Sequence, residues 1–226
     1  MVHIAVREVR GVWFAMAAAG HAFVATAVGE SEPEAYEALM QCLPRRADAR
    51  IFTEPTDLYD EASRLLAALH EGQSVTEGLT LSPNFLSPQL YRIYAIAASI
   101  PPGYVTTYGT LAVAARSEAR PVGRAMATNP LYPIVPCHRV VGADFSMTGY
   151  GGRQDEGALD AKLGRLSAEQ RGAPDATEVD TGSEPLTVYP VEWVLEASRE
   201  NDERIARGRR EAAAREEAAA MQLQLF

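Results

Sequence analysis

Cys137 is the residue whose surroundings most clearly suggest chemistry, because it lies in the run PCHRV at residues 136–140. A histidine and an arginine follow it directly, and positive charge near a thiol favours the thiolate, the nucleophilic form of cysteine. These neighbours predict a reactive thiol rather than the buried structural cysteine that a lone cysteine usually is. The second cysteine, Cys42, is far away in the sequence, so neither a disulfide framework nor a four-ligand zinc site is expected.

Two unusual stretches flank this run. Residues 129–136, NPLYPIVP, contain three prolines in eight positions, which predicts a stiff, extended segment with Cys137 at its end. Residues 149–152, GYGG, predict a flexible loop. The thiol would therefore follow a rigid support.

The first of the elements that must position these residues form a small α/β module over residues 1–84. Short strands are expected between residues 3 and 27, with turns at Arg10-Gly11 and Gly20. A helix capped by Ser31 follows, and a second helix is expected over residues 58–70. Nothing in this module suggests catalysis, so we expect it to be structural.

Residues 85–172 predict a helical module. Ser87 caps a helix over 89–99, a short helix follows at 111–115, and a third helix is expected over 121–128. Two short helices joined by a tight turn, the second bearing arginines and small residues, predict a helix-turn-helix.

The last part of the chain changes in composition. One more helix is expected at 159–168. Residues 173–190 are rich in acidic residues, Thr, Gly and Pro and predict a linker. Residues 191–226 predict a long, charged, alanine-rich helical tail.

The charge is unevenly distributed. The 226 residues carry a net charge of −9, which argues against a protein that binds nucleic acid over its whole surface. Residues 87–139, however, hold five arginines and one glutamate, a net charge of +4 around Cys137. No apolar run approaches the roughly 20 residues of a membrane span, and no signal peptide pattern opens the chain, so we expect a cytoplasmic protein with no membrane partner.

The run PCHRV, preceded by Asn129-Pro130 and followed by GYGG at 149–152, resembles the signature of the O6-alkylguanine-DNA alkyltransferases, also called methylated-DNA–protein-cysteine methyltransferases. The resemblance is close over residues 87–172. It implies a ribonuclease-H-like α/β module followed by an α-helical helix-turn-helix catalytic domain. It also implies direct DNA repair, in which an alkyl group passes irreversibly from O6 of guanine to Cys137.

Carried to the matching positions, the resemblance implies a role for each catalytic residue. Cys137 would accept the alkyl group, and His138 would take the thiol proton through a water molecule. Glu169 would orient His138, with Glu156 as the alternative partner. Tyr108 would donate a proton to guanine as the bond to the alkyl group breaks.

The same resemblance implies how DNA is held. Arg120 would enter the base stack when the target nucleotide is turned out, residues 121–128 would lie in the minor groove, and Asn129 would tie that helix to the active-site segment. The predicted DNA-binding residues are Arg120, Pro121, Arg124, Ala125, Thr106, Thr107 and Arg139. The predicted pocket residues are Asn129, Met126, Val140, Gly149, Tyr150 and Gly151. The chain departs from the family pattern at Pro121 and at residues 153–157, which look like an insertion.

The chemistry sets its own requirements. O6 of a paired guanine is buried in the duplex, so the base must be extruded before a protein nucleophile can reach its alkyl group. A thioether does not hydrolyse under cellular conditions, so one molecule would repair one lesion, without cofactor or metal. The partner would be double-stranded DNA containing O6-alkylguanine. The range of alkyl groups accepted and activity on O4-alkylthymine stay open.

Three other classes of protein fit these residues less well. Alkyltransferase-like proteins, which flag alkylated bases without transfer, carry tryptophan at the acceptor position, so Cys137 argues against them. A helix-turn-helix regulator whose cysteine senses alkylation would need an effector domain. A cysteine hydrolase would need Cys137 and His138 to face each other, which adjacent side chains seldom do.

The last five residues, QLQLF at 222–226, resemble the pentapeptide with which bacterial polymerases and repair proteins bind the sliding clamp. Gln224 stands where serine or aspartate is usual. The anchoring residues would be Gln222, Leu223, Leu225 and Phe226. The alternative is a helix end that packs on its own protein.

Overall fold

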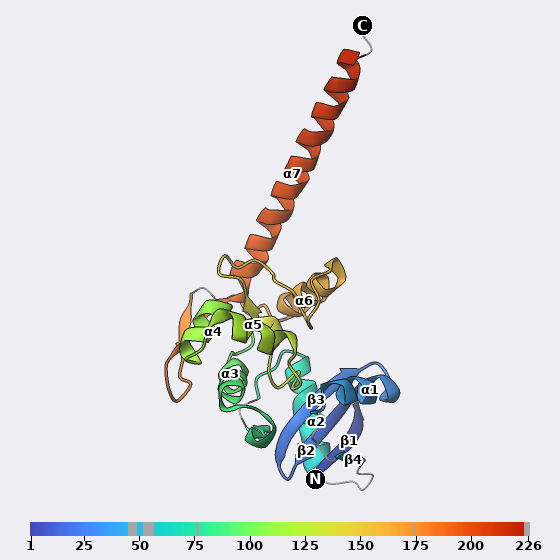
Figure 1. The fold of residues 1–226 in the computed structure, drawn as a ribbon, viewed down its shortest axis with the longest axis vertical. Coiled ribbons are helices and arrows are strands. Elements are labelled where there is room, and N and C mark those ends of the chain that lie inside the picture. Colours follow the sequence, from blue (N-terminus) through green and yellow to red (C-terminus); the bar gives the residue numbers. More distant parts are fainter. Residues whose placement is uncertain (45–48, 52–56, 76, 174, 224–226) are drawn as a thin grey trace.

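Two bodies share one continuous core in the computed structural model, which describes residues 1–44, 49–51, 57–75, 77–173 and 175–223. The first body is a sheet with helices and contains the N-terminus (Figure 1). The second contains helices and a smaller sheet, and a long C-terminal helix extends away from it (Figure 1). Within the described residues, no helix is both long enough and apolar enough to cross a membrane.

The N-terminal sheet is built on three antiparallel strands, β1 (Val2–Val9), β2 (Val12–Ala19) and β3 (Ala22–Gly29). The turns fall where the sequence predicts them, at Arg10-Gly11 and Gly20. These residues have φ angles of 55°, 81° and 65°, in the left-handed region that tight hairpin turns require.

Two further strands and two helices complete this body. The strand order is β4-β1-β2-β3-β5, with β4 (Ala49–Ile51) parallel to β1 and β5 (Thr80–Leu81) parallel to β3. The predicted cap at Ser31 is confirmed, since its side chain accepts a backbone hydrogen bond at the start of α1 (Glu32–Cys42). Because neighbouring strand residues point to opposite faces, α1 packs on one face and α2 (Asp57–His70) on the other.

The second body contains four helices before the tail. They are α3 (Pro88–Ala98), α4 (Tyr108–Ala114), α5 (Ala119–Ala127) and α6 (Glu156–Ala168), with 3-10 turns at Pro83–Phe85 and Cys137–Arg139. Ser87, Thr107 and Asp155 cap α3, α4 and α6 by accepting backbone N–H bonds. The pair α4 and α5 is in contact, in the arrangement expected of a helix-turn-helix. Since α5 begins at Ala119, Pro121 lies in its first turn, where a missing N–H costs nothing.

The prediction that residues 173–190 form a linker is wrong from residue 177 onward. Residues there form β8 (Thr177–Val179) and β9 (Leu186–Pro190), which complete a sheet of order β7-β6-β9-β8 with β6 (Tyr104–Thr107) and β7 (Val140–Val141). The side chains of β9 alternate between buried and half-buried positions. An alternation with a period of two residues is typical of a strand. The polar residues that precede Leu186 hid this alternation in the sequence. The second domain therefore contains a sheet as well as helices.

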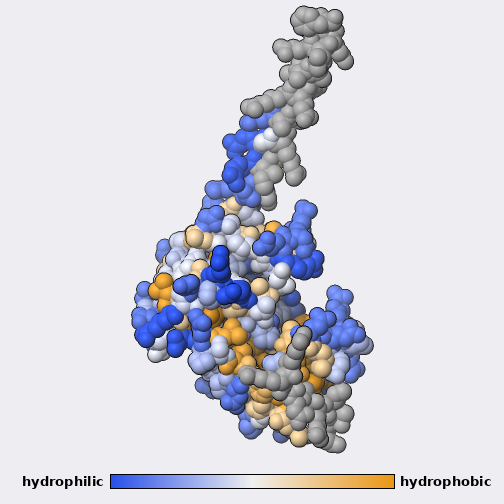
Figure 2. Space-filling view, viewed as in Figure 1, coloured by the Kyte–Doolittle hydropathy of each residue, from blue (hydrophilic) through white to orange (hydrophobic). Residues whose placement is uncertain are grey.

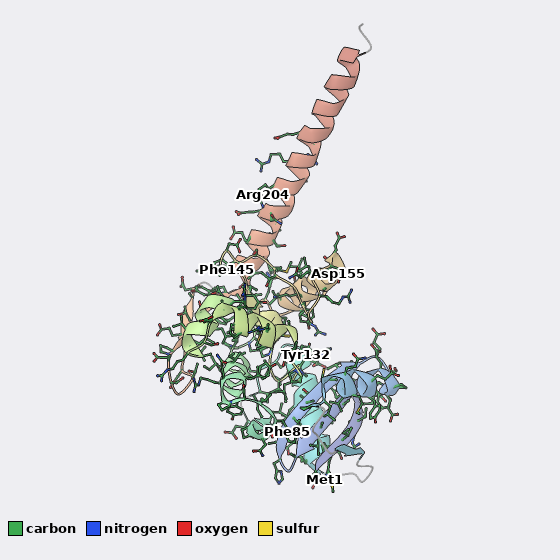
Figure 3. The ribbon with its side chains drawn as sticks, viewed as in Figure 1. Met1, Phe85, Tyr132, Phe145, Asp155 and Arg204 are labelled. Carbon is green, nitrogen blue, oxygen red and sulfur yellow. The ribbon has the colours of Figure 1, made fainter. Side chains whose placement is uncertain are left out.

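The last described helix is α7 (Val191–Leu223). Its first turns pack on the second body, where Val191 and Val194 are fully buried and the rings of Phe145 and Trp193 meet at 5.4 Å. Beyond this base the helix leaves the body, as the positions of Phe145 and Arg204 in Figure 3 show. The coloured part of the projecting helix is mostly hydrophilic, whereas apolar residues gather mainly on the lower half of the molecule (Figure 2).

Candidate active site

Cys137 lies at the bottom of a cavity of about 430 Å³. It is the first residue of the 3-10 turn Cys137–Arg139, and only 7% of its surface is exposed. The cavity is lined by Tyr108, Ala119, Gly123, Met126, Ala127, Cys137, Thr148, Gly149, Tyr150, Gly151, Gly152, Arg153 and Gln154. The walls therefore come from α4, α5 and the loop before α6, as the sequence led us to expect for Met126, Gly149, Tyr150 and Gly151.

The proline-rich segment before Cys137 is a folded turn, so the prediction that it is extended is wrong. Asn129 shapes the turn: its Oδ1 accepts from the backbone of Leu131 at 3.0 Å, and its Nδ2 donates to the carbonyl of Val135 at 2.8 Å. The backbone N–H of Val135 also donates to Leu131. Asn129 thus supports the segment and does not line the cavity, contrary to the prediction that it is a pocket residue.

The N-terminal body holds the same turn from outside. The backbone N–H of Thr26 on β3 donates to the carbonyl of Pro130, and its hydroxyl donates to the carbonyl of Tyr132, both at 2.8 Å. Thr26 is 2% exposed, so this pair of bonds is shielded from water. The sequence reasoning missed this contact, because nothing local in β3 indicates a partner about a hundred residues away.

His138 and Arg139 share one buried carboxylate. The Nε2 of His138 lies 2.9 Å from Oε1 of Glu169, and Arg139 donates to both carboxylate oxygens at 2.7 and 2.8 Å. All three residues are less than 5% exposed. The alternative partner Glu156 is exposed at the first turn of α6 and takes no part in this contact. Arg139 also donates to a backbone carbonyl, so the prediction that it binds DNA is wrong: a buried charge needs these partners.

The electrostatics of this triplet leave His138 neutral. Burial alone would raise the pKa of Glu169, but hydrogen bonds and charge from His138 and Arg139 outweigh it and hold the pKa at about 2. Burial is the main cause that lowers the pKa of His138. An ionised carboxylate only accepts, so Nε2 of His138 carries the proton and Nδ1 is left as an acceptor. Within the described residues, no atom bonds to Nδ1.

Lys162 is a buried cation close to the thiol that the sequence reasoning did not assign. Its Nζ donates to the carbonyls of Val140 at 2.7 Å and Thr148 at 3.3 Å, and burial lowers its pKa to about 8. Burial raises the pKa of Cys137, whereas Asn129 and the charge of Lys162 act in the opposite direction. The sequence did hold a signal that could have identified Lys162. It precedes Glu169 by seven residues, about two helical turns, so the two side chains lie on the same side of a helix.

Tyr108, the first residue of α4, lines the same cavity as Cys137. Its hydroxyl oxygen accepts a hydrogen bond from Thr148 at 3.0 Å, which leaves its own proton free to point elsewhere. Burial raises the pKa of Tyr108, so the phenol keeps its proton at neutral pH. Tyr108 is therefore a positioned hydrogen-bond donor on the cavity wall.

The stretch at residues 149–152 belongs to a tight hairpin rather than an open loop. Tyr150 and Arg153 exchange backbone hydrogen bonds at 2.8 and 3.0 Å across Gly151 and Gly152, which have φ angles of 56° and 75°. Two successive positive φ angles fit a two-residue hairpin turn and favour glycine at both positions. This hairpin is the outer wall of the cavity.

The predicted DNA-binding residues divide into two groups. Arg120 and Arg124 are exposed on α5, and Pro121 beside them is half-buried. The other predictions on this surface are wrong, because Ala125, Thr106 and Thr107 are buried: Ala125 packs in the core, Thr106 bonds to Thr187, and Thr107 caps α4. Val140 is likewise buried in β7 and does not line the cavity.

Comparisons with known proteins agree with this geometry. A family model described as "6-O-methylguanine DNA methyltransferase, DNA binding domain" matches residues 89–171. A methylated-DNA–protein-cysteine methyltransferase of Mycolicibacterium paratuberculosis is 41% identical over 85 residues, 37% of this chain and 48% of the relative. The alignment thus spans about half the length of that relative. The protein of the same name from Methanosarcina acetivorans is 35% identical over 106 residues, 46% of this chain and 67% of the relative.

Solved structures extend the likeness to the N-terminal body. A crystal structure of Mycobacterium tuberculosis OGT in complex with DNA matches with a TM-score of 0.54 and 25% identity, over 76% of this chain and 96% of that one. An O6-methylguanine-DNA methyltransferase from Pyrococcus kodakaraensis matches with a TM-score of 0.51 and 23% identity, over 76% of this chain and 100% of that one. The latter likeness is one of fold alone.

Proposed function

The chain belongs to the methylated-DNA–protein-cysteine methyltransferase family, and from that premise we propose that it repairs DNA by moving an alkyl group from O6 of guanine to Cys137. The proposal depends on how the Cys137 thiol, the His138–Glu169 pair and the cavity are arranged. The thiol of Cys137 lies at the bottom of an open cavity, next to the buried pair of His138 and Glu169 and beneath the two helices α4 and α5.

The transfer has a balanced course. His138 takes the thiol proton through a water molecule at Nδ1, and Glu169 stabilises the imidazolium that forms. The Cys137 thiolate attacks the alkyl carbon, a carbon–sulfur bond forms, and the bond between that carbon and O6 breaks. The electron pair of the broken bond moves into the guanine, and the proton of Tyr108 passes to the ring. Because the product is a thioether, each molecule acts once.

Access to the thiol supports extrusion of the base. Only 7% of Cys137 is exposed, and the way to it passes between α5 and the hairpin at residues 149–154. A guanine stacked in a duplex cannot enter such a cavity, whereas a nucleotide turned out of the helix can. We infer that α5 lies in the minor groove and that Arg120, exposed near its start, occupies the space that the base leaves.

The shape of the N-terminal body supports its predicted class. Three antiparallel strands with β4 parallel to β1, and helices on both faces, are consistent with a ribonuclease-H-like module. Its function in our proposal is structural, since Thr26 supports the turn that precedes Cys137.

The decisive experiment weighs the protein after reaction. Incubation with duplex DNA that carries O6-methylguanine should add one methylene to the peptide containing Cys137. Cys137→Ala should abolish transfer and retain DNA binding, because the thiol is the acceptor and α5 is the contact surface. Cys42→Ala is the matched control, since that free thiol is exposed and should be dispensable. Repair that persists in Cys137→Ala would refute the proposal.

Base extrusion has its own test in Arg120→Ala. This change should slow transfer from duplex DNA far more than transfer from the free O6-methylguanine base, since only the duplex must be held open. Arg64→Ala, an exposed arginine on α2, is the control and should change neither rate. Equal losses on both substrates would mean that Arg120 supports the fold instead.

A second proposed partner is the sliding clamp. The side chains of Gln222 and Leu223, and all of Leu225 and Phe226, lie outside the described residues. The support is the sequence together with α7, whose course away from the body would present its end to a partner (Figure 1). A binding titration against the host's clamp, with and without residues 222–226, tests it. If deletion leaves the affinity unchanged, this partner is wrong and the repair function stands.

A further inference from the structure

The insertion at residues 153–157 has no part in the transfer chemistry, yet it forms part of the cavity mouth. We name residues 149–155 the pocket arm. Its turn at Gly151 and Gly152 is closed by the two backbone bonds between Tyr150 and Arg153. The arm also packs closely: a Cβ built on Gly149 would overlap the carbonyl of Arg153, and one on Gly152 would lie 3.2 Å from the carbonyl of Ala127 on α5. The arm is therefore a folded hairpin that lies against α5 at Gly152.

Asp155 anchors the end of this arm to α6. Its Oδ1 accepts from the backbone N–H of Ala158 at 3.1 Å and so caps the helix. The same carboxylate accepts two hydrogen bonds from Arg153, from Nε and Nη2, both at 2.8 Å. Figure 3 shows Asp155 at the outer end of α6, on the opposite side of the molecule from Met1. The guanidinium of Arg153 is thus oriented by a helix N-terminus.

Most of the hydrogen-bonding capacity of Arg153 is unused. A guanidinium has five N–H donors, and Asp155 takes two of them. Within the described part of the chain, no other residue bonds to the side chain, which is 70% exposed. An ion pair exposed to water is weak, so it does not prevent a second acceptor from binding to the free donors of Arg153.

The position of Arg153 indicates which kind of hydrogen-bond acceptor could bind its free donors. The residue lines the same cavity as Cys137, but its side chain is 70% exposed whereas Cys137 is 7% exposed, so Arg153 lies nearer to solvent. If a base enters this cavity, its sugar and phosphates stay at the mouth. A planar guanidinium with free donors matches two phosphate oxygens, and most contacts that position a protein on DNA are to phosphate.

We propose that Arg153 binds a backbone phosphate next to the extruded nucleotide, an inference that rests on the proposed function. The pocket arm would thus hold the flipped strand from the side opposite α5. Asp155 has two opposed effects in this arrangement: it aims the guanidinium, and its negative charge weakens the attraction to phosphate.

The test is the salt dependence of DNA affinity, measured in the Cys137→Ala background so that no transfer occurs. Arg153→Gln should weaken binding by about tenfold and reduce the slope of log affinity against log salt by about 1. Arg153→Lys should keep the slope, because the charge is kept. The matched control is Arg10→Gln, since Arg10 is 74% exposed and paired with Glu71 but lies in the N-terminal body. A slope in Arg153→Gln equal to that of Arg10→Gln would overturn the proposal.

Asp155→Asn separates contact with DNA from support of the arm. Asparagine caps helices as well as aspartate, so α6 should be unchanged while the repulsion of phosphate is removed. DNA binding should therefore become several-fold tighter, and the gain should vanish in the double variant with Arg153→Gln. An effect of Asp155→Asn on binding that is the same with and without Arg153→Gln would instead mean that Asp155 acts by supporting the arm and that Arg153 does not contact DNA. A wild-type protein that binds DNA without transfer would refute the proposed function and leave this test valid.

Discussion

Glu169 is the residue on which the interior of the site depends most, because it compensates two buried groups, His138 and Arg139. Removing one partner of a buried ion pair leaves the other charge without compensation, which costs about 3–5 kcal/mol. Glu169→Gln should therefore lower the free energy of unfolding by about that amount at neutral pH. Urea denaturation measures it, and Glu184→Gln is the control, since Glu184 forms an exposed ion pair with Arg116.

The same residue predicts a pH dependence. The folded-state pKa of Glu169 is about 2, below the ordinary value of 4.5. A carboxylate with a lowered pKa contributes stability above the ordinary value and loses it as the pH falls toward the folded value. The stability difference between the wild type and Glu169→Gln should thus shrink between pH 4.5 and pH 2. A difference that stays constant over this range would mean that Glu169 is not ionised in the fold.

A substitution at Tyr108 distinguishes an effect on the transfer rate from an effect on DNA affinity. Tyr108→Phe keeps the ring on the cavity wall and removes the hydroxyl that accepts from Thr148. Single-turnover transfer should slow by about 10²-fold or more, the usual contribution of a positioned general acid, while DNA affinity stays within about twofold. Unchanged single-turnover kinetics would remove Tyr108 from the mechanism.

At the scale of elements, the turn at residues 129–136 decides where the thiol lies. The side chain of Asn129 shapes this turn by donating one hydrogen bond and accepting another, and Thr26 donates two that hold the turn against β3. Asn129→Ala should destabilise the fold by about 1–3 kcal/mol and slow transfer by about 10²-fold, because a displacement of 1 Å at the acceptor is that costly.

The control for this element is Thr128→Ala. Thr128 is the neighbouring residue, and its hydroxyl donates to the carbonyl of Arg124 within α5 and is also hydrogen-bonded to Tyr94 on α3, so neither partner belongs to the turn. Its loss should destabilise the fold by about 1 kcal/mol, the usual contribution of a hydrogen bond, and should leave the transfer rate unchanged. Thermal unfolding and single-turnover rates of both variants make the comparison. If the two substitutions have equal effects, the prolines and not Asn129 determine the conformation of the turn.

For the whole molecule, the segment from residue 177 is part of the fold up to the first turns of α7. β9 pairs with β6, and Val191 and Val194 are fully buried. A protein ending at residue 176 should lose cooperative unfolding, because it exposes this apolar surface. A protein ending at residue 200 should unfold within about 0.5 kcal/mol of the full chain, since the described residues beyond it are exposed. Equal destabilisation by both truncations would contradict this division.

The sequence by itself determined the features that depend on neighbours in the chain. The caps at Ser31 and Ser87 and the turn at Arg10-Gly11 were predictable because a cap or a tight turn depends on a few consecutive residues. The histidine and arginine that marked Cys137 as a candidate nucleophile were also a local signal, although in the fold His138 is neutral and Arg139 is paired with Glu169.

The tertiary structure alone decided which polar groups meet across long separations. Arg139 and Glu169 are 30 residues apart, and Thr26 and Tyr132 are 106 apart. A sequence shows that Arg139 is charged, but its burial depends on whether a carboxylate from α6 reaches it, and that follows from the packing of α6 on the Cys137 turn. For the same reason a polar stretch predicted as linker became β8 and β9, because a strand is stable only where a partner strand, here β6, accepts its hydrogen bonds.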